Sequence, residues 1–199
     1  MFGKHKKPPI TGQRILIISD IHYNLTDEEL AVLQQNFDQC WLLGDMSSEV
    51  LKLVQELKCP VIGVCGNHDT PDIFEKYSFT NVHGTECTVN GIHIVGIQGS
   101  SKYKNSNTCM LTQQESLAIA KALPKAQVLL AHDSPFGMHS SEIHKVGLKG
   151  ITEYLKRNKP ALYLYGHHHD HKEYMFKKTK CILVYRFGVI EPDGSYHRV

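Results

Sequence analysis

The chain has 199 residues, of which 41% are hydrophobic and 21% are charged. These proportions are typical of a folded globular protein and exclude a disordered or fibrous one. The formal net charge is only +2, so the overall charge gives no indication of a nucleic-acid or anionic-membrane partner.

The length predicts one compact domain, which we expect over residues 14–199 after a flexible N-terminal tail of residues 1–13. Five short, mostly apolar runs are typical of strands buried on both faces. They lie at residues 14–19, 39–43, 61–65, 127–131 and 161–165. Between them, Thr26 with Glu29 and Thr112 with Glu115 form the capping-box pattern that begins a helix. A third helix is predicted over residues 144–157.

The remaining segments also carry readable signals. Residues 88–98 alternate around Asn90 and Gly91, which predicts a β-hairpin, and residues 173–196 are β-rich. Strands alternating with helices predict an α/β (α+β) fold with two packed mixed sheets and helices outside. Residues 99–110 form a long polar connection without clear periodicity, and such connections are often functional. We therefore expect a substrate loop there.

Six cysteines are present, but they form no Cys-x-x-Cys pair, and no signal peptide begins the sequence. No apolar run approaches the ~18 residues of a membrane span. We therefore expect a cytoplasmic protein without a membrane partner, whose cysteines are small buried hydrophobic residues. The cysteines are Cys40, Cys59, Cys65, Cys87, Cys109 and Cys181.

Polar side chains that can bind a metal ion follow each of the five predicted buried strands. Because the carboxyl ends of strands in α/β sheets open onto a common crevice, these side chains are expected to converge. Gly44, Gly66 and Gly166 lie just before them, where a tight turn or a close backbone approach is needed. The potential ligands are Asp20, His22, Asp45, Asn67, His132, His167 and His169.

This oxygen and nitrogen donor set, without cysteine, suits divalent Mn, Fe, Ni, Co or Zn. Seven ligands are too many for one catalytic ion with open positions, whereas one bridging aspartate would give each of two ions four protein ligands. Two ions ~3.5–4 Å apart can hold a phosphoryl oxygen while a shared hydroxide attacks it. With two aspartates and one hydroxide, such a centre has a net charge of about +1 and attracts phosphate.

The fragments SDIH, GD, GNHD, H and GHHH occur in this order and resemble the motif set of the calcineurin-like metallophosphoesterase superfamily. The resemblance covers residues 15 to roughly 170 and implies a four-layer αββα sandwich. Two divalent ions are implied, with Mn²⁺ as the first expectation. The implied ligands are Asp20, His22 and His169 for the first ion, Asp45 as the bridge, and Asn67, His132 and His167 for the second ion.

The same resemblance implies that His68 is the catalytic histidine, which stabilises the transition state and protonates the leaving oxygen. Asp69 would orient His68, or alternatively cap the helix that begins near residue 71. His168 lies between two expected ligands, and since adjacent side chains diverge, we expect it to face solvent. The same expectation holds for His139, His144, His171 and His197.

The stretch from His132 onward is similar to a small phosphodiesterase-like branch of this superfamily. Two features depart from the common pattern. Tyr23 stands where glycine often follows the first motif, and Arg186, Phe187 and Gly188 replace a frequent Asn-Pro-Gly-Ser. Both departures bear on the identity of the substrate rather than on metal binding.

The resemblance implies a dinuclear phosphoesterase that hydrolyses a small phosphodiester, such as a cyclic nucleotide or another nucleotide, with a metal-bridging hydroxide as nucleophile. One alternative is a phosphomonoesterase or protein phosphatase that uses the same site. A second is a non-catalytic scaffold of the same fold, as in the retromer subunit. Nucleic acid is not an expected partner, because the sequence predicts neither a basic groove nor a second domain.

Overall fold

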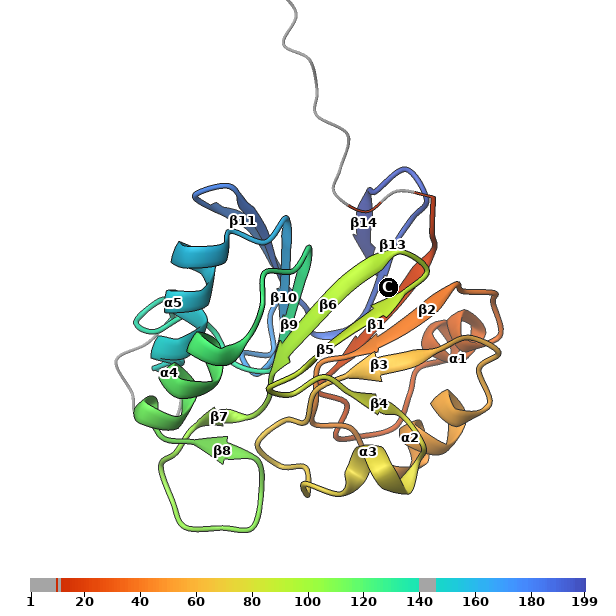
Figure 1. Cartoon of the computed structure of the whole chain (residues 1–199). Coiled ribbons are helices and arrows are strands. Elements are labelled where there is room, and N and C mark those ends of the chain that lie inside the picture. Colours follow the sequence, from red (N-terminus) through yellow and green to blue (C-terminus); the bar gives the residue numbers. More distant parts are fainter. Residues whose placement is uncertain (1–9, 11, 140–145) are drawn as a thin grey trace, which may run out of the picture.

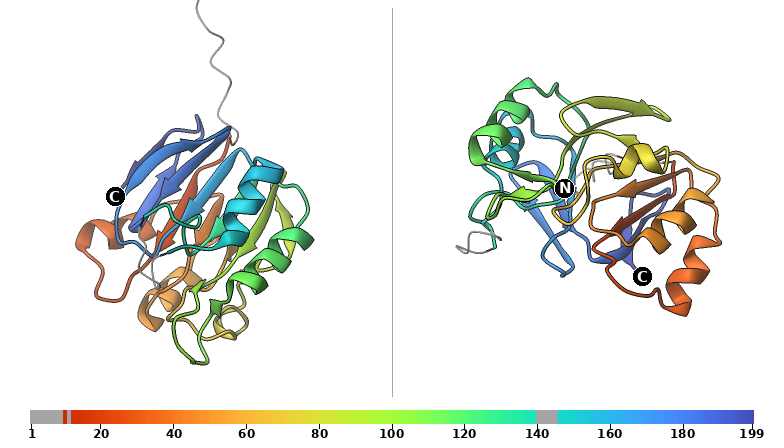
Figure 2. Two further views of the ribbon diagram at one scale, coloured as in Figure 1. Left: turned by 90° about the vertical axis from the view of Figure 1, so that its left-hand side faces the viewer. Right: turned by 90° about the horizontal axis from the view of Figure 1, so that it is seen from below.

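Two six-stranded β-sheets pack face to face and carry helices on their outer faces (Figure 1). The structure, a computed structural model, describes residue 10 and residues 12–139 and 146–199. Figure 2 shows the two groups of helices on opposite sides of the paired sheets. The predicted four-layer αββα sandwich of two mixed sheets is thereby confirmed.

The first sheet has the strand order β14-β13-β1-β2-β3-β4. Strands β1 to β4 are parallel to one another, whereas β13 pairs antiparallel with β1. Helices α1 (Asp27–Leu33), α2 (Ser48–Gln55) and α3 (Ile73–Lys76) accompany this sheet. The strands are β1 (Ile15–Ser19), β2 (Gln39–Leu42), β3 (Val61–Gly63), β4 (Thr80–Asn81), β13 (Arg186–Ile190) and β14 (Tyr196–Arg198).

The second sheet has the order β11-β12-β10-β9-β6-β5. Its four inner strands are parallel to one another, and both edge strands are antiparallel. Helices α4 (Gln113–Ala122) and α5 (Lys149–Asn158) accompany it. The strands are β5 (Glu86–Val89), β6 (Ile92–Ile97), β9 (Val128–Ala131), β10 (Leu162–Tyr165), β11 (Lys172–Phe176) and β12 (Thr179–Leu183).

Three hydrophobic clusters fill the three interfaces between the four layers. Along β1, Ile15 and Ile17 point to the opposite sheet, while Leu16 and Ile18 point to the helices, as the two-residue period of a strand requires. The second sheet repeats this alternation in its own cluster beneath α4 and α5. Buried on both faces, the central strands read as continuous apolar runs, which explains why the sequence predicts them.

The predicted local signals are mostly confirmed. Both capping boxes form, at Thr26 with Glu29 and at Thr112 with Glu115, and the turn at residues 90–91 connects β5 to β6. The third helix begins later than predicted, at Lys149, and residues 140–145 lie outside the described part. The polar connection at residues 99–110 begins and ends in short strands, because β7 (Ser100–Ser101) pairs with β8 (Met110–Leu111), and its role as a substrate loop stays a prediction.

The outer parts of the chain need further comment. Most of the predicted tail lies outside the described residues, but Ile10 is only 3% exposed and packs into the core between the sheets. Four cysteines are buried and two are half-buried, and all six are free. None of the helices in the described part combines the length and hydropathy that crossing a membrane requires.

An ion pair ties the start of β13 to α1. Arg186 donates to both carboxylate oxygens of Glu29, each at 2.6 Å, and its Nη2 also donates to the Asn24 carbonyl at 2.9 Å. Glu29 also accepts the Thr26 amide in the capping box. Burial alone would raise the pKa of Glu29, but the hydrogen bonds from Arg186 and Thr26 outweigh it and lower the pKa. The pair therefore stabilises the fold.

Glu29→Gln is expected to lower the free energy of unfolding by about 1–3 kcal/mol, because it leaves the Arg186 guanidinium without its charged partner. The difference in unfolding free energy between wild type and variant is largest above about pH 4.3, the ordinary pKa of glutamate, because Glu29 is ionised there. It shrinks as the pH falls through the lower folded-state pKa, because Glu29 then becomes protonated in the folded protein. Denaturant unfolding at pH 7 and at pH 3 measures it. Glu173→Gln is the matched control, since it breaks the exposed pair with Lys180. A pH-independent loss would contradict the role given to Glu29.

Candidate metal centre

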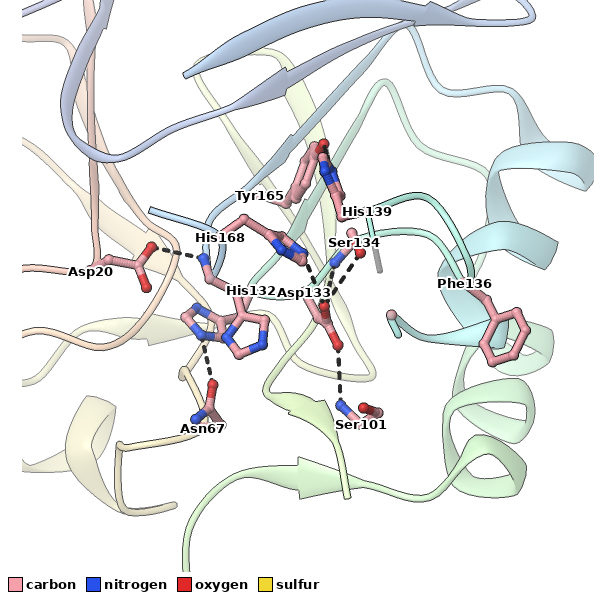
Figure 3. Close-up of polar contacts among 12 residues, drawn as sticks. Asp20, Asn67, Ser101, His132, Asp133, Ser134, Phe136, His139, Tyr165 and His168 are labelled. Carbon is pink, nitrogen blue, oxygen red and sulfur yellow. Dashed lines mark hydrogen bonds and ion pairs between the residues drawn. The ribbon is translucent and has the colours of Figure 1, made fainter. Parts of the chain in front are cut away.

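The loops that follow β1, β2, β3, β9 and β10 meet at one edge of the sandwich and bring the predicted ligands together. Two clusters of potential metal ligands form there, and within each the donor atoms lie within 4.8 Å of one another. Asp20, His22 and His169 make the first cluster, and Asp45, His132 and His167 make the second. Asn67, the seventh predicted ligand, lies 3.1 Å from His132 through its Oδ1 atom (Figure 3).

Asp20 is the most buried member of the first cluster, at 1% exposed. Its Oδ2 accepts hydrogen bonds from Ser19 Oγ at 2.6 Å and from the His167 amide at 2.8 Å. Its Oδ1 is buried and has no hydrogen-bond partner among the described residues, although His169 Nε2 lies 3.5 Å away. A buried carboxylate oxygen without a partner is costly, and a bound cation would satisfy it.

His132 is fully buried in the second cluster, and a hydrogen bond to the backbone fixes the orientation of its ring. Its Nδ1 lies 2.7 Å from the Leu43 carbonyl oxygen, which can only accept a hydrogen bond, so Nδ1 carries a proton. Its Nε2 faces Asp45 Oδ2 at 3.2 Å and Asn67 Oδ1 at 3.1 Å. A histidine held in this way by a backbone carbonyl is typical of metal ligands.

The backbone is unusual at four of the predicted ligands. Asp20, Asp45, His167 and His169 have φ angles of 55°, 58°, 71° and 52°. Non-glycine residues seldom adopt this left-handed conformation, which costs about 1–3 kcal/mol at each position. Such strain persists only where surrounding contacts fix it, and it is concentrated at functional sites.

Two of the predicted glycines allow close approach of neighbouring loops. A Cβ atom on Gly66 would lie 2.1 Å from Asp45 Oδ1, and one on Gly166 would lie 1.9 Å from Ser19 Oγ. Side chains at these positions would push the aspartates out of place. The reason for glycine here is therefore close packing around the two carboxylates.

Charges within the site act on one another. Burial opposes ionisation of Asp45 and of His132, but their mutual attraction outweighs it, which lowers the pKa of Asp45 and raises the pKa of His132 to about 10. The pKa of Asp20 is also lowered, against the effect of burial, by His169 and His132. The carboxylates are thus ionised, as cation binding requires, and a bound divalent ion would displace the proton shared with His132.

His68 and Asp69 follow Asn67 in the loop after β3. The His68 side chain is exposed, its ring lies edge-on to His22 with centroids 5.6 Å apart, and its amide donates to Asp45 Oδ1 at 2.7 Å. That Asp69 orients the His68 ring stays a prediction. Asp69 Oδ2 accepts the backbone amides of Asp45 and Gly66, at 2.8 and 2.7 Å, so it holds two loops together.

The expectation that His168 faces solvent was wrong. Its side chain is only 7% exposed, and its Nε2 lies 3.6 Å from Oδ1 of the fully buried Asp133 (Figure 3). The ring also stacks on His139, with centroids 4.2 Å apart, and His139 in turn lies 2.8 Å from the Tyr165 hydroxyl. The histidine between the two predicted ligands therefore anchors their loop to the core.

Asp133 was not identified from the sequence. Its carboxylate accepts the Ser134 amide at 2.7 Å and the Ser101 amide at 3.1 Å (Figure 3). It therefore joins three loops: its own after β9, the one that carries β7, and the His168 loop. Its position directly after His132 is the one sequence signal that could have drawn attention to it.

A family model for the calcineurin-like phosphoesterase superfamily domain matches residues 14–192. The chain belongs to this superfamily. The match spans every element that contributes to the two clusters. Among curated proteins, no sequence matches the chain at a significant level.

Solved structures share the fold at low sequence identity. The protein TT1561 of Thermus thermophilus is 16% identical, with a TM-score of 0.67, and the match covers 94% of this chain and 99% of that one. The phosphopantetheinyl hydrolase of Mycobacterium tuberculosis is 12% identical, with a TM-score of 0.64 and coverages of 96% and 97%. An archaeal phosphodiesterase is 13% identical, with a TM-score of 0.54 and coverages of 94% and 98%.

His168→Phe is expected to weaken metal binding about 10-fold, because it retains the stacking on His139 but loses the polar contact with Asp133 that steadies the His167 and His169 loop. Chelator competition measures the affinity. His197→Phe is the matched control, because His197 is half exposed and lies on β14. Wild-type metal affinity in His168→Phe would show that the contact with Asp133 does not position the loop.

Proposed function

We propose that the chain is a metal-dependent phosphoesterase whose centre holds two divalent ions. In this proposal Asp20, His22 and His169 bind one ion, Asn67, His132 and His167 bind the other, and Asp45 bridges them. The observation that carries it is the convergence of seven donors from five strand ends, two of which are buried carboxylates. The unpartnered Asp20 Oδ1 supports a cation at the same place.

Asp45 has the right surroundings for a bridge. Its Oδ2 faces His132 of the second cluster. In the first cluster, burial lowers the pKa of His22, and the charge of Asp45 opposes that effect. Its charge therefore acts on both groups of donors. When bound, two divalent ions of this kind supply Lewis-acid polarisation of a phosphoryl oxygen and activation of water.

The protein's own residues supply position and protons. His68 is exposed at the rim of the site, and among the described residues its ring makes no hydrogen bond, so it can approach a bound phosphoryl group and protonate the leaving oxygen. Asp45 fixes the backbone of His68 through its amide. Asp69 accepts hydrogen bonds from the Asp45 and Gly66 amides and so fixes the positions of the two loops relative to each other.

A small phosphodiester is the substrate class that we propose, with nucleotide-like compounds first among them and Mn²⁺ as the first metal to test. Similarity to a phosphodiesterase and to a phosphopantetheinyl hydrolase supports ester hydrolysis at phosphorus in general. The test is an activity screen on chelated protein reloaded with Mn²⁺, Fe²⁺, Ni²⁺, Co²⁺ or Zn²⁺. Its substrates are bis-p-nitrophenyl phosphate and p-nitrophenyl phosphate.

The screen separates the alternatives. Turnover of the diester at least 10-fold above that of the monoester supports the phosphodiesterase proposal. A preference for the monoester would favour a phosphomonoesterase or protein phosphatase. Absence of turnover with every metal would favour a non-catalytic scaffold.

The roles of individual residues are tested separately from the screen. His68→Ala is expected to retain metal and lose about 10²–10⁴-fold in kcat, because it removes a proton donor but no ligand. Asp45→Asn is expected to lose metal and activity together, because both ions lose a charged ligand. Elemental analysis alongside kinetics measures both, with His197→Ala as the control. Equal metal loss in the His68 and Asp45 variants would contradict these roles.

A further inference from the structure

A groove opens beside the candidate metal centre, between the loop that follows β1 and helices α1 and α2. It has a volume of about 300 Å³, and His22 of the first cluster forms part of its wall. This volume is at the lower end of the range for small-molecule sites. The residues that line the groove also include Tyr23, Leu30, Glu49, Val50 and Leu53.

The groove is apolar and open to solvent where it leaves His22. Tyr23 is 81% exposed, and its ring lies edge-on to His22 with centroids 6.4 Å apart. Leu30 and Leu53 are 38% and 42% exposed on the facing helices. An apolar surface that begins at a predicted metal ligand is placed to contact the organic part of a molecule whose phosphate is at the metals.

Hydrogen bonds hold the backbone on one side of the groove in place. The Asn24 carbonyl, next to Tyr23, accepts a hydrogen bond from Arg186, and Arg186 also pairs with Glu29 on α1. Tyr23 and Arg186 are the two places where the sequence departs from the common superfamily pattern. They are far apart in the chain, but the Asn24 carbonyl brings them to the same wall. Preorganisation of this kind lowers the cost of binding.

Charge limits what the groove accepts. The Glu49 carboxylate lines it, and none of the described residues that line it is a lysine or arginine. A second phosphate or a carboxylate on the ligand would therefore meet a like charge in the lining of the groove. A neutral group with an aromatic or aliphatic surface, such as a nucleoside or a phenyl ring, has no such penalty.

We propose that this groove binds the non-leaving ester group of the substrate and selects phosphodiesters in which that group is neutral and aromatic or aliphatic. The selection rests on the phosphoesterase function proposed above, because the groove opens from the metal centre. It favours a phosphodiester with a nucleoside-like group over a dinucleoside polyphosphate.

A series of p-nitrophenyl phosphodiesters tests the groove, with a methyl, phenyl, 5′-thymidyl or 4-carboxyphenyl group as the second ester. The wild-type kcat/KM is expected to be about 10-fold higher for the phenyl and thymidyl esters than for the methyl ester. Tyr23→Ala and Leu30→Ser are expected to remove most of this preference through KM. Leu117→Ser is the matched control, because Leu117 on α4 is as exposed as Leu30.

A variant of Glu49 tests the effect of its charge on ligand selection. Glu49→Gln is expected to raise kcat/KM severalfold for the carboxyphenyl ester and to leave the phenyl ester unchanged. Equal rates for all four esters, or equal losses on the methyl and phenyl esters in the variants, would overturn the proposal for the groove while leaving the phosphoesterase function in place.

Binding of compounds that are not hydrolysed tests the groove independently of the proposed phosphoesterase function. Calorimetry on the Mn²⁺-loaded protein compares phenyl methylphosphonate with methyl methylphosphonate. Tighter binding of the phenyl compound, lost in Leu30→Ser, supports the groove even where no ester is hydrolysed. Equal binding of the two compounds overturns it. Concentration-dependent dimerisation that Leu30→Ser abolishes would also overturn it, by assigning the groove to a second copy of the chain.

Discussion

Two buried carboxylates hold the candidate metal centre together, and the rest of the site depends on them. Each directs one oxygen toward histidine donors and binds with the other a backbone amide from a different loop. Asp20 accepts the His167 amide, which joins the ends of β1 and β10, and Asp45 accepts the His68 amide, which joins the ends of β2 and β3. Donors from distant parts of the chain are therefore fixed relative to one another by the groups that would bind the ions.

The left-handed backbone at four of the predicted ligands follows from the same contacts. Asp20 and Asp45 adopt this conformation in the loops after β1 and β2, where their side chains reach the amides that they accept. Charge-assisted hydrogen bonds of this kind are about twice as strong as neutral ones and offset part of the strain. Substitution of either aspartate therefore affects both metal binding and the geometry of two loops, so stability has to be measured together with metal content.

The sequence predicts most of the fold because its strongest signals are local. Strands buried on both faces read as apolar runs, and helix starts read as capping boxes at Thr26 and Thr112. One expectation about a residue beside the site was wrong. His168 was expected to diverge from its neighbours into solvent, but the left-handed turns at His167 and His169 direct it into the core beside Asp133. The two amides that Asp69 accepts could not be predicted, because the fold brings them to it from another loop and from the turn before it.

The proposed chemistry and the proposed selectivity depend on different parts of the fold. The donor clusters depend on strand ends within the stretch that the family model matches, whereas the groove depends on one loop and the facing sides of α1 and α2. Proteins with this fold at 16% identity or less can share the strand ends and differ in such loops, since specificity is carried by sites built on a common scaffold. Arg186 connects the two parts. It lies at the start of β13, beside β1 in the sheet, and holds through Asn24 and Glu29 the loop that carries Tyr23. The position of the apolar wall relative to the metal centre is therefore set by the sheet itself.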